Sequence, residues 1–441
     1  MNDTVNSALS ALSEGRRHLF DLAERLRASP ELGFFEVKTA AMLAAELEGM
    51  GARVERGLAL TGLRAEVGPP GAPAIALLAD MDALPTQGAP GGTAHSCGHH
   101  AQMAILAAVF KALVAVYLPG REKIRLLFIA SPAEEYVDLG RRMELRESGT
   151  IRYLSGKQEM IRLGVFDDVS VVLKYHSMAD SPVRKATVNG TLNGFMAKRA
   201  EFIGKAAHAG AHPEDGVNAL NAASLALQAI HAQRETFVDS DHVRVHPILS
   251  EGGTVVNSVP ARAVLETYIR AATHEAIMDA AIKVDRALCA GALAVGASLR
   301  IRSTPGYQAF HPSPAMGNLL GEAAKTLLPA SAIDFEDASY ASDDIGDVAC
   351  LLPTCQLGYS GFCGTIHNAD FAPTDSERAY FEPAAILLRL TCTLAENGGA
   401  KAASIRKEFQ PHFSKTDYLA SLDAQFSERF FDGSTAGFKT L

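Results

Sequence analysis

Side chains able to bind a metal ion are concentrated in one short stretch, LLADMDALPTQGAPGGTAHSCGHHAQ. An apolar run ends there in Asp80 and Asp82, and a Pro/Gly/Thr-rich segment leads on to Cys97, His99 and His100. A thiolate and imidazoles close to carboxylates suit a borderline-soft divalent cation such as zinc. The alternative for an isolated Cys-Gly-His is a buried cysteine beside surface histidines. The loop position after an apolar strand favours the metal site.

Two adjacent glutamates follow a second apolar run, 123–130, through Ser-Pro-Ala. Most glutamate pairs lie on solvated faces, but here the strand and the proline direct at least one carboxylate of Glu134 and Glu135 inward. One could bind the metal while the other remains free as a general base. A divalent cation makes water nucleophilic near neutral pH, so such a base suits a hydrolase.

Four further histidines are candidates from weaker signals. His176 ends a third apolar run, 169–175, where a buried structural histidine is the alternative, and His367 lies in the loop GTIHNADF. His208 and His212 lie in GKAAHAGAHPEDG. This segment either forms a polar turn or carries a histidine donor that folds over the metal site and stabilises an oxyanion.

The elements that position these residues alternate between strand and helix, which predicts an α/β domain. Three short apolar runs predict buried strands, and if they are neighbours their carboxyl ends bring the candidate ligands to one sheet edge. Helices are predicted over 9–27, 36–50, 101–118 and 384–394, and the same domain's pattern resumes at 315–328 and 350–357.

A second pattern interrupts this one. Strand-like segments at 187–203, 243–249, 264–270 and 298–302 and helices at 217–234 and 276–295 predict a small inserted α+β domain. We therefore expect a catalytic domain in two parts, 1–186 and 304–400, an inserted domain at 187–303, and a polar and aromatic tail at 401–441.

Composition narrows the class of protein. The chain has 441 residues, 48% of them hydrophobic, and a net charge of -9, which argues against nucleic acid as a main partner. We expect no secretory signal and no membrane span, since the most apolar segment, 105–118, is interrupted by Lys111. Six scattered cysteines predict no disulfide framework, so a reducing cytoplasm is expected.

Taken together, these motifs resemble the M20 metallopeptidase family, in particular its amidohydrolase branch, which includes aminobenzoyl-glutamate hydrolases and N-acyl amino acid amidohydrolases. The resemblance is carried, in the family's order, by DMDALP at Asp80, HSCGHH at His95, SPAEE at Ser131, the strand ending at His176, GKAAHAGAHPEDGVNAL at Gly204, GGTVVNSVP at Gly252 and IHNADF at Ile366. It implies a zinc-peptidase-like α/β catalytic domain with an inserted lid and dimerisation domain, one or two Zn or Mn ions, and a homodimer or higher homo-oligomer.

The resemblance also implies roles for individual residues. Glu134 matches the general base, Asp82 the residue that orients a ligand, and His208 the lid histidine that reaches the oxyanion, often across a dimer interface. Asn257 and Arg270 lie where lid residues contact a substrate carboxylate. The implied metal ligands are Cys97, His99, Glu135, His176 and His367.

Two positions depart from the branch, and the second of them borders the expected pocket. His100 replaces the usual aspartate, and Tyr136 stands where a small residue is common. We expect a hydrolase that cleaves a C–N bond in a small, carboxylate-bearing aromatic substrate. Hydrolytic deamination of an activated aminobenzoate, as in the 5-nitroanthranilate aminohydrolases, is the alternative within this chemistry, and an inactive small-molecule-binding protein is the alternative of another class.

Overall fold

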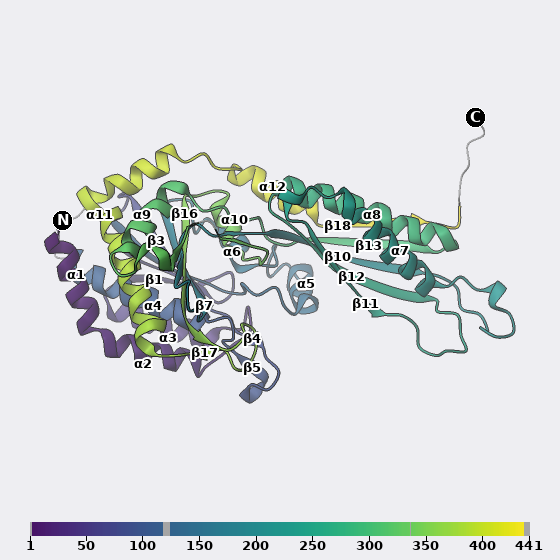
Figure 1. Ribbon diagram of the computed structural model, residues 1–441, viewed down its shortest axis with the longest axis horizontal. Helices are drawn as coiled ribbons and strands as arrows, with labels where there is room; N and C mark the ends of the chain where they lie inside the picture. Colours follow the sequence, from purple (N-terminus) through teal and green to yellow (C-terminus); the bar gives the residue numbers. More distant parts are fainter. Residues whose placement is uncertain (1, 118–123, 336, 436–441) are drawn as a thin grey trace. The chain divides into compact units, whose positions relative to one another are not determined.

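The computed structural model describes residues 2–117, 124–335 and 337–435, and the chain forms two compact units (Figure 1). Unit 1 contains Met1–Thr191, Phe310–Ser339 and Asp343–Lys415, and unit 2 contains Leu192–Ala309, Tyr340–Ser342 and Thr416–Leu441. The expected helix end at Leu118 and strand start at Lys123 lie outside the described residues.

Unit 1 is built on a mixed sheet whose central strands are parallel. Strand β3 (Ala74–Asp80) lies between β6 (Arg125–Ser131) and β7 (Val171–Ala179), and β7 pairs in turn with β16 (Thr354–Cys363). Every residue of β3 and β6 is buried. The three apolar runs are therefore neighbours, which the sequence left open, and their carboxyl ends share one edge.

The remaining strands extend this sheet or form two-residue pairs. Their order is β1-β2-β6-β3-β7-β16-β8-β14, with β17 paired to β16, while β4 pairs β5 and β15 pairs β9. Their bounds are β1 Arg53–Leu58, β2 Gly62–Val67, β4 Leu84–Pro85, β5 Thr93–Ala94, β8 Ala186–Thr187, β9 Thr191–Leu192, β14 Ile333–Asp334, β15 Ala338–Ser339 and β17 Ala372–Pro373.

Helices pack on this sheet because their apolar faces join its core. Helix α4 (His99–Tyr117) contacts β3, and it is long and apolar enough to cross a membrane, yet 78% of its most apolar window is buried inside the protein, as in a core helix. The other helices of unit 1 are α1 Asn2–Glu14, α2 Arg16–Arg27, α3 Val37–Gly49, α5 Leu139–Glu147, α6 Gly156–Leu163, α9 Pro314–Lys325, α10 Ile345–Ala349 and α11 Glu382–Glu408, which is interrupted at 396–399.

Two predicted boundaries in unit 1 are wrong. The helix expected over 9–27 is two helices separated at Gly15. His176 does not end its strand but lies inside β7, which continues to Ala179, because β16 pairs with it over that length. Lys174 and His176 therefore share one face of β7.

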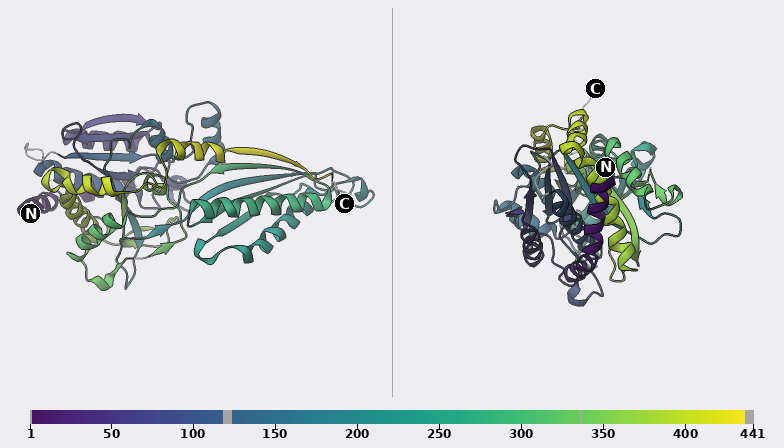
Figure 2. Two further views of the ribbon diagram at one scale, coloured as in Figure 1. Left: turned by 90° about the horizontal axis from the view of Figure 1, so that it is seen from above. Right: turned by 90° about the vertical axis from the view of Figure 1, so that its left-hand side faces the viewer.

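Unit 2 has the predicted order strand–helix–strand–strand–helix–strand. Strands β10 (Gly194–Ile203), β11 (Arg244–Glu251), β12 (Arg262–Ala271) and β13 (Ser298–Pro305) form an antiparallel sheet in the order β11-β12-β10-β13. Helices α7 (Ala219–Gln233) and α8 (His274–Val295) lie along one face of it (Figure 2).

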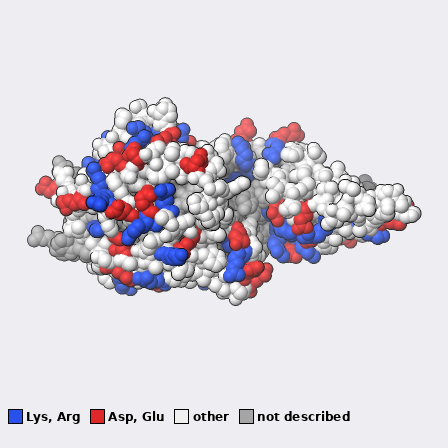
Figure 3. All heavy atoms as spheres, turned by 90° about the horizontal axis from the view of Figure 1, so that it is seen from below, with Lys and Arg blue, Asp and Glu red and all other residues white. Residues whose placement is uncertain are grey.

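The tail, which the sequence did not place, contributes to both units. Part of it continues α11, while α12 (Lys415–Gln425) leads to β18 (Ser427–Asp432), which adds an edge strand to the sheet of unit 2 beside β13. Acidic and basic side chains are interspersed on the face drawn in Figure 3.

Candidate metal centre

Four of the five predicted metal ligands lie close to one another at the shared strand edge. Ligand atoms of Cys97, Glu135 and His367 lie within 4.8 Å of one another. The His367 Nε2 is 3.5 Å from the Glu135 Oε1, and the Cys97 Sγ is 3.6 Å from the His176 Nε2. Residues that are far apart in the sequence thus converge as the motifs predict.

The fifth predicted ligand, His99, lies beside the predicted base. Ligand atoms of Asp80, His99 and Glu134 also lie within 4.8 Å of one another, and the His99 Nε2 is 3.7 Å from the Glu134 Oε2. Glu134 and Glu135 therefore face the same histidine- and cysteine-rich site from one turn of the chain.

Backbone hydrogen bonds orient two of the imidazoles toward this site. The Nδ1 of His99 donates to the carbonyl oxygen of Asp82 at 2.8 Å, and the Nδ1 of His176 donates to that of Ser177 at 2.9 Å. In the neutral imidazole, this hydrogen bond places the lone pair on Nε2, facing the site, which is the tautomer a metal ligand needs.

Unusual backbone conformations bring the ligands together. Gly98 has φ 86°, and a Cβ there would lie 2.0 Å from the Ser177 hydroxyl, so only glycine fits between Cys97 and His99. Ala133 has φ 51° immediately before the glutamate pair. His367 has φ 70°, and its backbone N–H donates to the carbonyl of Ser96 at 2.8 Å, which ties its loop to the cysteine loop.

The electrostatics of this cluster suit a cation. Burial and the neighbouring carboxylates raise the pKa values of the Cys97 thiol and the Glu134 carboxyl well above their usual ranges, and burial raises the pKa of Glu135 to about 7. The Oε1 of Glu135 is buried and accepts no hydrogen bond from the residues that the structure describes. A divalent cation would favour the ionised forms of these groups and pair with them, so the residues fit the metal that the sequence implies.

Asp82 contacts His99, the side chain that it is expected to orient. Its Oδ1 is 3.3 Å from the His99 Nδ1, and its Oδ2 accepts a hydrogen bond from the Glu135 N–H at 2.9 Å. Although burial works against the charged imidazole, Asp82 raises the pKa of His99 to about 9. Burial lowers the pKa of His176 to about 4.

The two residues that depart from the amidohydrolase branch have different surroundings. His100 is buried, its Nε2 is 3.3 Å from the Tyr380 hydroxyl, and its ring lies against Phe362 and Tyr380. It belongs to none of the ligand groups among the described residues. Tyr136 follows the glutamate pair, with the Arg142 guanidinium 5.8 Å from its ring centre.

A buried charged network that the sequence analysis missed lies next to Glu134. Lys157 on α6 binds Asp80 and Asp344, and Lys174 on β7 binds Asp80 at 2.6 Å and Asp343 at 2.5 Å. Although burial opposes charge in each group, the opposite charges lower the pKa of Asp80 and raise the pKa of both lysines. Two features of the sequence could have indicated this network: a lysine within the apolar run 171–175 and the adjacent pair Asp343 and Asp344.

The predicted lid residues lie in unit 2, and the structure describes their local contacts. The Nδ1 of His208 accepts hydrogen bonds from the backbone of Gly210 and Ala211, and His212 lies 3.3 Å from Glu214. The Arg270 guanidinium donates to the Ser342 hydroxyl at 2.6 Å, and the Asn257 carbonyl accepts from Ala209.

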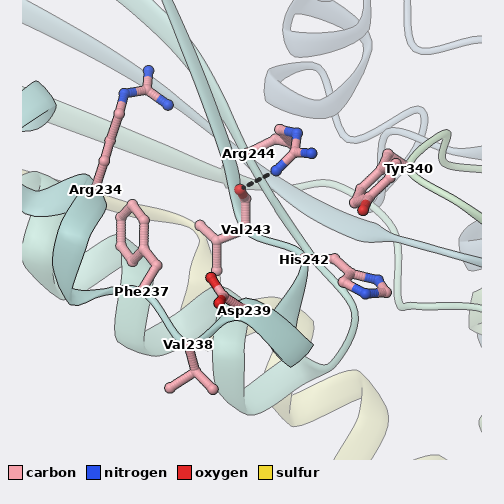
Figure 4. Close-up of a pocket in the computed structure, with 8 residues that line it drawn as sticks. All are labelled: Arg234, Phe237, Val238, Asp239, His242, Val243, Arg244 and Tyr340. Atoms are coloured by element: carbon pink, nitrogen blue, oxygen red, sulfur yellow. Dashed lines mark hydrogen bonds between the residues drawn. The ribbon is translucent and has the colours of Figure 1, made fainter.

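Unit 2 also contains a cavity of about 360 Å³ (Figure 4). The Arg244 guanidinium lies 4.3 Å from the ring centre of Tyr340 at its wall. The other lining residues are Arg234, Phe237, Val238, Asp239, His242 and Val243. None of the predicted metal ligands lines it.

Comparisons with known proteins agree with the fold and the motifs. Residues 191–292 match the M20 peptidase dimerisation domain. The chain is 27% identical to the Xaa-Arg dipeptidase of Mus musculus over 369 residues, covering 79% of this chain and 78% of the relative. It is 28% identical to one subunit of the p-aminobenzoyl-glutamate hydrolase of Escherichia coli over 404 residues, covering 78% of this chain and 86% of that subunit.

Among solved structures, a dinuclear metal-binding peptidase from the M20 family of Bacillus subtilis has a TM-score of 0.67 at 22% identity, covering 87% of this chain and 99% of that one. This likeness concerns the fold. With the dimerisation domain and the two relatives, it confirms the resemblance of this chain to the M20 metallopeptidase family that its motifs indicate.

Proposed function

We propose that the protein is a divalent-metal-dependent hydrolase that cleaves a C–N bond in a small, carboxylate-bearing aromatic substrate. The observation that carries the proposal is the different placement of the two adjacent glutamates. Glu135 lies with Cys97 and His367 in one potential ligand group, whereas Glu134 lies with Asp80 and His99 in another. The proposed ligands are Cys97, His99, Glu135, His176 and His367, for one or two Zn or Mn ions.

Glu134 performs the proton transfers in this proposal. A divalent cation, when bound, supplies Lewis acidity that activates water and polarises the scissile group. Glu134 takes a proton from the attacking water, which forms a bond to the carbon attached to nitrogen. It then delivers that proton to the nitrogen as the C–N bond breaks.

Residues of unit 2 complete the proposed site. His208 donates to the negative charge that develops on the substrate, and His212, Asn257 and Arg270 contact the substrate, with Arg270 suited to a carboxylate. Tyr136 borders the pocket from unit 1. The dimerisation domain supports a homodimer, and we propose that the enzyme acts in the cytoplasm.

The relatives support amide substrates. By name, one is a subunit of a p-aminobenzoyl-glutamate hydrolase and another is a dipeptidase. Deamination of an activated aminobenzoate uses the same proton transfers with ammonia as the leaving group. An inactive binding protein is disfavoured by the presence of both the full ligand set and the base.

The test is a product assay on the Mn- or Zn-loaded protein with p-aminobenzoyl-glutamate, N-acyl amino acids, an Xaa-Arg dipeptide and nitro-substituted aminobenzoates. Released amino acid and free ammonia are measured separately. Amino acid without ammonia supports amide hydrolysis, ammonia from an aminobenzoate supports deamination, and binding without either product supports the inactive alternative.

The variant Glu134→Gln should reduce turnover by about 10²–10⁴-fold, because general acid–base catalysis contributes that much. Its metal content should stay that of the wild type. Glu322→Gln, at an exposed position of α9, removes an equal charge and should leave turnover unchanged. Full turnover by the Glu134→Gln variant would refute the assigned base.

A further inference from the structure

The buried charged network of Asp80, Lys157, Lys174, Asp343 and Asp344 lies next to Glu134, and Asp343 is the one of these five whose side chain is not fully buried. Ligand oxygens of Glu134, Asp343 and Asp344 lie within 4.8 Å of one another. The side chain of Asp343 is 6% exposed and that of Glu134 is 7% exposed, whereas those of Asp344, Asp80, Lys157 and Lys174 are 0% exposed. Among these network residues, Asp343 is therefore the one that lies close to Glu134 and also has exposed side-chain surface.

The surroundings of Asp343 fix its carboxylate and keep it charged. Its Oδ1 accepts a hydrogen bond from the Ile345 N–H at 2.8 Å, and its Oδ2 lies 2.5 Å from the Lys174 ammonium. Lys174 is held in turn by Asp80 at 2.6 Å. A carboxylate has about four lone-pair positions, so two such partners leave room for another donor.

The spacing of Glu134 and Asp343 suits a nitrogen placed between them. In the proposed reaction the leaving nitrogen must come within hydrogen-bond reach of Glu134 to receive its proton. Ligand oxygens of the two residues lie no more than 4.8 Å apart, so one nitrogen can lie about 2.9 Å from both of them, with an O···N···O angle of at most about 112°. One nitrogen can thus contact both carboxylates.

We propose that Asp343 accepts a hydrogen bond from an N–H of the leaving nitrogen, and so makes the enzyme specific for substrates whose scissile nitrogen carries a hydrogen. The inference rests on the proposed function. The contact directs the nitrogen lone pair toward the proton on Glu134 and stabilises the amine as it becomes protonated. Asp343 itself gains and loses no proton, and the bonds formed and broken are those of the hydrolysis.

The experiment compares p-aminobenzoyl-glutamate with its amide-N-methyl analogue, and a nitro-substituted 2-aminobenzoate with its N,N-dimethyl analogue. We expect the wild type to prefer the N–H compound by about 10–150-fold in kcat/KM, the range of a hydrogen bond to a charged group. Asp343→Asn should lose most of this preference by slowing the N–H substrate and not its methylated analogue. Asp343→Glu should restore part of it, and Asp343→Ser replaces the Asn variant if that variant does not fold.

Asp344→Asn is the matched control, because it removes the same charge from the same network at the neighbouring residue, whose side chain is fully buried. It should keep the preference for N–H compounds. An undiminished preference in the Asp343 variants, or an equal loss in Asp344→Asn, would overturn the proposal.

Calorimetric binding of the same pairs to the metal-loaded Glu134→Gln protein, with and without Asp343→Asn, separates this inference from the proposed function. A preference for the N–H compound that depends on Asp343 supports the contact even if no substrate is turned over. Equal binding of both members of each pair, or binding of neither, overturns it.

Discussion

At the scale of single residues, Asp82 is expected to orient the imidazole ring of His99. Asp82 contacts the His99 Nδ1 through both its carbonyl and its carboxylate, and it also accepts from the Glu135 N–H. We expect Asp82→Asn to weaken metal binding by about 10–100-fold, as for the loss of other groups that orient metal-binding histidines. Titration calorimetry with Zn or Mn measures this, and Asp21→Asn on the surface of α2 is the control. Unchanged metal affinity would contradict the orienting role.

The buried carboxyl of Glu36 predicts a pH dependence of folding. Burial, and secondarily the charge of Asp82, raise the pKa of Glu36 from its ordinary value of 4.5 to about 8. Between about pH 4.5 and 8, the folded protein therefore keeps a proton on Glu36 that the unfolded chain has lost. As the pH rises through that range, this group lowers the free energy of unfolding.

Glu36→Gln should remove this contribution, since an amide does not titrate and can still bond the Ala133 N–H and Thr61 that Glu36 contacts. Urea unfolding of metal-free protein should show the variant gaining stability relative to the wild type from pH 5 to pH 8. A difference between the two proteins that does not vary with pH would contradict the assignment.

At the scale of elements, the two buried lysines hold α6, β7, β3 and the segment before α10 together through aspartates. Lys157→Met leaves Asp80 and Asp344 without one cation, and removing one partner of a buried ion pair costs about 3–5 kcal/mol. Urea unfolding at pH 7 measures the loss. Lys325→Met, which breaks the exposed pair with Glu322, should cost less than about 1 kcal/mol. Similar losses in the two variants would show that the network is not stabilising.

The edge strand β18 attaches the tail to unit 2 through one of two adjacent phenylalanines. Phe431 packs against the core of unit 2, whereas Phe430 is 63% exposed. Phe431→Ala should lower the free energy of unfolding by about 1–3 kcal/mol, somewhat less than for a fully buried ring. Phe430→Ala should change it by less than about 0.5 kcal/mol. Equal effects would mean that β18 is not docked in this register.

At the scale of the whole molecule, the dimerisation domain predicts self-association through unit 2. Several large apolar side chains of this unit are exposed: Leu225, Ile248, Leu249, Val255 and Val256. Such residues favour an interface with a second copy of the chain. Ile248→Asp should shift the protein toward monomer in light scattering over a concentration series. Val183→Asp, at an exposed position of unit 1, should not. A wild-type protein that is monomeric at all concentrations would refute the expected dimer.

The order of the main elements and the chemical groups of the candidate site could be predicted from the sequence. Short apolar runs predicted the buried strands β3, β6 and β7, because a strand covered on both faces needs apolar residues at every position. The parallel arrangement then required that residues following those strands meet at one edge. The motif around Cys97 and the glutamate pair could also be recognised, because the residues of each are contiguous in the chain.

Features that depend on contacts between distant segments could be seen only in the folded structure. The length of β7 beyond His176 follows from its pairing with β16, and the docking of β18 follows from its pairing with β13. The burial of Lys157 and Lys174 was not predictable, because a lysine is normally exposed and its aspartate partners lie up to 187 positions away. The position of Asp343 beside Glu134 arises in the same way, since only the folded sheet brings the two carboxylates together.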